Sequence, residues 1–125
     1  MYILIAVINN EDIFDDLITG WLDIGITGAT VMESTDSLQL ISQHIPIFAG
    51  FRTREGMRYN KTLFTVIEDR EILDHAVAYL ETLCRETGKP HQGIYIVAPL
   101  MSFGHLGVEI DSEQRQRDIE KKLGN

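Results

Sequence analysis

Residues 2–8 read Tyr-Ile-Leu-Ile-Ala-Val-Ile, an unbroken apolar run that predicts a β-strand near the start of the chain. Apolar side chains fill both the odd and the even positions, so both faces of this strand need burial. Three further runs of β-branched and aromatic residues predict strands at 27–32, 62–67 and 94–98. The chain therefore contains the four strands of one sheet, with the first strand in its interior.

Two amphipathic helices are predicted between these strands. Asn9 or Asn10 can cap the first helix, in which apolar residues recur every three or four positions until Gly25 ends it. Asp69 can cap the second helix, which carries one apolar stripe and ends at Gly88. The order is strand, helix, strand, strand, helix, strand.

This order predicts an α+β fold of the ferredoxin-like type, a βαββαβ sandwich. Its four-stranded antiparallel sheet carries both helices on one face. The other face also needs cover, and a second copy of the chain is the simplest partner, which predicts a homo-oligomer. The alternative is that the C-terminal tail folds back over this face.

Length and charge restrict the classes of protein to which the chain can belong. With 125 residues, it is expected to form one domain, 1–107, followed by a charged tail, 108–125, with the spacing of a marginal helix. A net charge of −8 opposes binding to nucleic acid and to an anionic membrane. The first apolar run is too short for membrane insertion. A single cysteine, Cys84, is typical of a reducing compartment and predicts a cytoplasmic location.

A loop without periodicity, 34–60, is predicted between the second and third strands, and loops of this length are usually functional. Its middle is apolar and either docks a partner protein or packs on the domain itself. The residues of this partner-binding segment are Ile45, Pro46, Ile47, Phe48 and Phe51.

Positive charge is concentrated where this loop returns to the sheet. Four basic residues stand there against one acid, Glu55, and they are Arg52, Arg54, Arg58 and Lys61. Such a cluster favours a phosphate or carboxylate ligand, because each group can form charge-assisted hydrogen bonds. The alternative is a solvated loop that balances nearby carboxylates.

The turn 86–93, Glu-Thr-Gly-Lys-Pro-His-Gln-Gly, could also approach a ligand. Gly88 and Gly93 allow close approach of backbone amides, and Lys89 and His91 add polar side chains. Its spacing is not that of a Walker loop, and an ordinary helix-to-strand turn is the alternative. The histidines lack metal-binding spacing and no serine or cysteine lies in a nucleophile elbow, so we predict no metal site and no catalytic residue.

Three segments together resemble the PII signal-transduction proteins, which act in nitrogen regulation. They are 25–31 (Gly-Ile-Thr-Gly-Ala-Thr-Val), Lys61 after the long loop, and 87–89 (Thr-Gly-Lys) followed by Gly93. The resemblance extends over residues 1–107.

The resemblance implies a ferredoxin-like homotrimer that regulates and does not catalyse. Clefts between its subunits would bind an adenine nucleotide, and its long loop would contact a target such as a membrane transporter or an enzyme. Carried over to this chain, Val7 and Thr30 would line the cleft. Lys61 would stand at the base of the loop, and Gly93 would belong to the turn that cradles phosphate.

The chain also departs from the family pattern. His91 replaces a glycine, Ile94 replaces a phosphate-binding lysine, and His105 and Gly107 replace two arginines. Each lost cation removes charge-assisted bonding of about 1.5–3 kcal/mol. The alternatives are therefore that the effector is another nucleotide, that it is a small anion, or that there is none. The lost charge could be replaced from the loop by Arg52, Arg54 and Arg58.

Two other function classes fit the same architecture. One is a metal-binding trimer that resembles the copper-tolerance proteins. The other is a small ferredoxin-like enzyme, in which His75 or His91 would have to act as a base. A trimer in solution favours the PII-like interpretation, and a dimer favours the enzyme.

Overall fold

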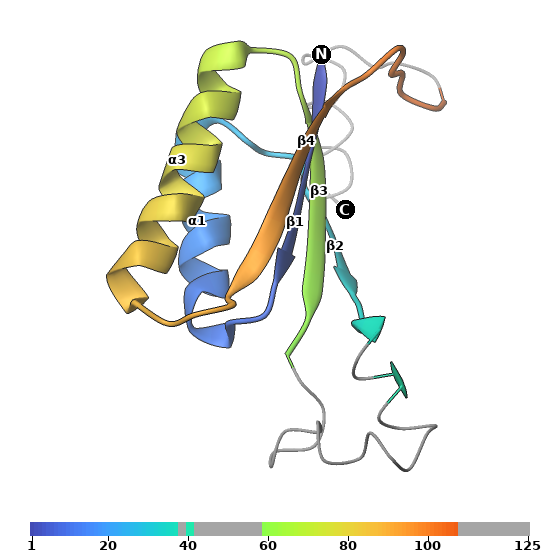
Figure 1. Ribbon diagram of the computed structural model, residues 1–125. Coiled ribbons are helices and arrows are strands. Elements are labelled where there is room, and N and C mark those ends of the chain that lie inside the picture. Colours follow the sequence, from blue (N-terminus) through green and yellow to red (C-terminus); the bar gives the residue numbers. More distant parts are fainter. Residues whose placement is uncertain (38–39, 42–58, 108–125) are drawn as a thin grey trace, which may run out of the picture.

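The computed structural model describes residues 1–37, 40–41 and 59–107. Its elements are β1 (Tyr2–Ile8), the short 3-10 helix η1 (Glu11–Ile13), α1 (Phe14–Ile24), β2 (Thr30–Glu33), β3 (Lys61–Ile67), α3 (Arg70–Thr87) and β4 (Gly93–Pro99). Both long helices lie on one face of the sheet, and no described element covers the other face (Figure 1). The predicted α+β architecture is thereby confirmed.

The sheet has four antiparallel strands in the order β2-β3-β1-β4. β1 is central as predicted, because it pairs over its whole length with β3 and with β4. This arrangement is compatible with a ferredoxin-like fold. The two edges of the sheet are β2 and β4.

The core lies between the sheet and the two helices. Leu4, Ala6 and Ile8 of β1 are buried against α1 and α3, each with at most 1% of its surface exposed. Trp21 of α1 is also buried, and its indole Nε1 donates a hydrogen bond to the carbonyl oxygen of Ala76 at 3.2 Å. Every second residue of β1 therefore faces the helices, as the strand period requires.

Asp69 caps α3 as predicted, whereas Asn10 caps the short helix η1 and not α1, which begins after Ile13 without a side-chain cap. The Asn10 side chain accepts a hydrogen bond from the Asp12 amide at 3.0 Å, and Asp69 accepts one from the Glu71 amide at 2.8 Å. Gly25 and Gly88 end the two helices with φ of 120° and 69°, values that a residue with a Cβ rarely adopts.

One strand differs from its prediction. β2 begins at Thr30 instead of at residue 27, because the Gly28 carbonyl accepts a hydrogen bond from the Thr65 hydroxyl at 3.1 Å. At Gly28, a hydrogen bond from a side chain thus takes the place of a backbone hydrogen bond between the two strands. The tail 108–125 lies outside the described residues. Among the described helices, none is long and apolar enough to cross a membrane.

Candidate functional site

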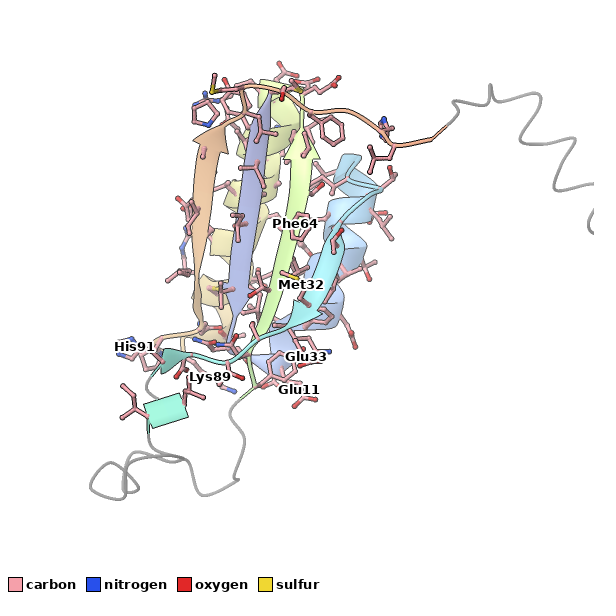
Figure 2. The ribbon with its side chains drawn as sticks, turned by 90° about the vertical axis from the view of Figure 1, so that its right-hand side faces the viewer. Glu11, Met32, Glu33, Phe64, Lys89 and His91 are labelled. Atoms are coloured by element: carbon pink, nitrogen blue, oxygen red, sulfur yellow. The ribbon has the colours of Figure 1, made fainter. Side chains whose placement is uncertain are left out.

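The face of the sheet opposite the helices, here called the open face, is largely apolar. The register aligns Ile5 of β1 with Phe64 of β3 and Ile96 of β4. Ile96 is 48% exposed and Ile94 is 60% exposed. Figure 2 looks onto this face, on which Met32 and Phe64 lie on neighbouring strands. The second apolar face predicted from the sequence is thus present and uncovered among the described elements.

Lys61 lies at the end of the sheet where the long loop returns. Its Nζ is 4.7 Å from the ring centre of Phe14, 5.4 Å from that of Tyr59 and 3.5 Å from a carboxylate oxygen of Glu33. Burial acts to lower the pKa of Lys61, but Tyr59 and Glu33 outweigh it and the pKa is raised. Lys61 is therefore a charged group held between two rings and a carboxylate.

The turn between α3 and β4 lies at the same end. Gly93, with φ of 151°, packs so closely on Val7 that a Cβ would collide with the Val7 carbonyl oxygen. His91 has a left-handed backbone with φ of 53° and is exposed. The Lys89 Nζ is 2.9 Å from a carboxylate oxygen of Asp12. Gly88, Lys89, His91 and Gly93 are thus placed beside the end of β1.

Hydrogen bonds connect this turn to the base of the long loop. Asn60 donates to the Asn9 side chain at 3.0 Å, and the Asn9 amide donates to the Gln92 carbonyl at 2.8 Å. Asn10 donates to the buried Gln92 side chain at 2.8 Å. The Ser34 hydroxyl donates to the Asn60 side chain as well. From the sequence, Asn9 and Asn10 were predicted only as helix caps, although polar residues directly at strand ends are a usable signal for such contacts.

A groove of about 610 Å³ lies on the β2 side of the sheet. The segment 25–30, the second half of β3 and the rings of Phe103 and His105 form its walls. The two rings pack edge to face with centres 5.2 Å apart. The groove reaches the backbone of β3 because β2 pairs only with Lys61–Phe64.

The predicted site residues fall into two groups within one chain. Val7, Lys61 and the turn residues lie at one end of the sheet, while Thr30 lies on β2 beside the groove. Because β2 and β4 are opposite edges, Thr30 and Gly93 are separated by the width of the sheet. Two predicted sets lie outside the described residues. They are the loop arginines Arg52, Arg54 and Arg58, and the apolar segment Ile45, Pro46, Ile47, Phe48 and Phe51.

Within residues 1–37, 40–41 and 59–107, no group of three or more His, Cys, Asp or Glu side chains could hold a metal ion. Burial raises the pKa of the Cys84 thiol. Cys84 is therefore held as the thiol, and the thiolate, which is the reactive form, is disfavoured.

No protein-family model and no curated protein matches the chain.

Proposed function

We propose that the chain is a PII-like regulatory protein with a ferredoxin-like fold. It forms a homotrimer, binds a small anionic effector, an adenine nucleotide, in clefts between subunits, and signals through its long loop. The regulated partner is a protein such as a membrane transporter or an enzyme, and the protein acts in the cytoplasm.

The separation of the two groups of site residues carries this proposal. In a ring of identical subunits, one edge of each chain meets the opposite edge of the next. Such a contact would bring the turn with Lys89 and Gly93 of one subunit to the groove beside Thr30 of its neighbour. Each interface would then hold one complete cleft.

The open face supports assembly independently of the site. Exposed apolar surface of this kind usually marks an interface, because its transfer out of water is favourable. Ile94, Ile96 and Met32 are each between 46% and 60% exposed in the single chain. A ring with these faces turned inward would bury them.

The hydrogen bonds at the loop base support the signalling role. Asn60 stands at the end of the loop 34–60, and Gln92 stands in the turn. Asn9 bonds to both of them. A ligand that displaces the turn would therefore act on the loop through contacts that already exist.

Two measurements test the proposal. Light scattering should give three times the 14.2 kDa mass of the chain. Isothermal titration with ATP, ADP, AMP, cyclic nucleotides, 2-oxoglutarate and bicarbonate should then detect one adenine nucleotide per subunit. A monomer or dimer would contradict the assembly, and the absence of saturable nucleotide binding would contradict the effector.

A further inference from the structure

The charges at the cleft residues bear on which effector the site can accept. Both lysines of the candidate site are already paired within the chain. Lys61 lies 3.5 Å from Glu33, and Lys89 lies 2.9 Å from Asp12. A phosphate group that approaches either ammonium must compete with a carboxylate that is covalently part of the protein.

This end of the sheet also carries a further acid, Glu11. Figure 2 shows all four residues at the end from which the long loop leaves, with Glu11 and Glu33 on the β2 side and Lys89 and His91 on the β4 side. Arg85 of α3 follows the buried Leu83 by two residues and so lies about 200° around the helix from it, facing away from the core. Each of the two lysines at this end of the sheet is therefore paired with a carboxylate.

The groove on the other edge is no more positive. Glu68 and Asp69 line it, and no lysine or arginine is among its described lining residues. His105 is the basic side chain there. A ligand that spans the turn of one subunit and the groove of the next would meet acids on both sides.

The charge of the site should therefore give AMP, ADP and ATP different affinities. Each additional phosphate brings negative charge toward Asp12 and Glu33, while the lysines that would attract it are already neutralised. A nucleotide with one phosphate meets less of this repulsion.

We propose that Glu33 and Asp12 set the charge that the effector can carry, and that the effector is a nucleotide with no more than one phosphate group. This inference rests on the proposed effector site. It assigns specificity to two acids instead of to the lysines beside them.

The experiment is isothermal titration of the full chain with AMP, ADP and ATP, without Mg²⁺ so that the phosphates alone fix the charge of each nucleotide. The wild type should bind AMP at least about tenfold more tightly than ATP, a difference of about 1.4 kcal/mol. Glu33→Gln and Asp12→Asn should each raise ATP affinity several-fold and change AMP affinity by less than about twofold, because each frees one lysine.

Asp23→Asn is the matched control. It removes the same charge from an exposed position near the other end of α1, about 16 Å of helix away from Asp12, and should leave both affinities unchanged. All three side chains are exposed, and thermal unfolding verifies that the variants fold.

The outcomes separate the two proposals. Tighter binding of ATP than of AMP by the wild type, or unchanged ATP affinity in both acid variants, would overturn this inference while the effector site stands. Failure of every nucleotide to bind any of the proteins would overturn the effector site and this inference together.

Discussion

The two faces of the sheet have similar apolar residues and different surroundings. On β1, Leu4 and Ala6 are fully buried beneath the helices, whereas Ile3 and Ile5 on the open face are only half-buried. On β4, Ile96 leaves 48% of its surface in water. The covered face is therefore completed by α1 and α3, whereas none of the described elements completes the open face. The stability of the fold and the function of the protein should depend on different faces.

The largest expected effect comes from the covered face. Leu4→Ala should lower the free energy of unfolding by about 2–5 kcal/mol, because it leaves a cavity in a site with no exposed surface. Urea unfolding measures the loss. Leu22→Ala, at a position on α1 that is 52% exposed, is the control and should change stability by no more than about 0.5 kcal/mol. Equal losses would show that the two environments do not differ.

The second effect tests the open face. Ile96→Glu should dissociate the proposed homotrimer and leave a folded subunit, because assembly would bury an unpaired charge. Light scattering measures the mass, and circular dichroism verifies the fold. Leu22→Glu makes the same change on an exposed helix surface and should leave the mass unchanged. An unaltered trimer in Ile96→Glu would place the interface elsewhere.

The contrast between the faces was accessible from sequence because it depends on local patterns. The apolar run of β1 and the helix ends Gly25, Asp69 and Gly88 depend on residues close together in the chain, and the structure confirms them. Asn10 caps η1 in place of the longer helix predicted there. The start of β2 was predicted three residues too early, because the side-chain hydrogen bond at Gly28 comes from Thr65, which is 37 residues away in the sequence. Local propensity does not contain that information.

The candidate site was less predictable for the same reason. Asn60 and Asn9 are 51 residues apart, and Asn10 and Gln92 are 82 residues apart. No pattern in sequence connects them until the antiparallel order of the strands is known. The pairing of Lys61 with Glu33 likewise depends on the register of β2 with β3. Residue type indicated two lysines suited to phosphate, and only the fold shows that each has a carboxylate partner.

A third prediction compares one substitution on both faces of β3. Thr65→Val should cost about 0.5–1.5 kcal/mol, because Thr65 is 4% exposed and loses its hydrogen bond to the Gly28 carbonyl. Thr62→Val should cost at most about 0.5 kcal/mol, since its partner, the Ser34 hydroxyl, is only partly buried and can turn to water. Urea unfolding of the two variants measures the difference. A larger loss in Thr62→Val would show that the open face is the better protected one.

The smallest effect concerns Lys61 and Tyr59, where the covered side of the sheet meets water. Burial raises the pKa of Tyr59, and the opposing effect of Lys61 is weaker. The pKa of Lys61 is raised as well, because Tyr59 and Glu33 outweigh its desolvation. Both groups hold their protons more tightly in the folded protein than in the unfolded chain. Their contribution to stability is therefore complete below a pH of about 10 and is lost as the pH rises above that value.

Urea unfolding between pH 8 and about 11 measures this loss, with the upper limit set by the ordinary pKa of tyrosine and lysine. Tyr59→Phe keeps the ring beside Lys61 and removes the hydroxyl, so its stability should fall less steeply over the alkaline range. Unchanged steepness would mean that Tyr59 is as accessible to water in the folded protein as in the unfolded chain. That result would contradict the burial of Tyr59 beside the base of the long loop, and with it the close contact between the Tyr59 ring and Lys61.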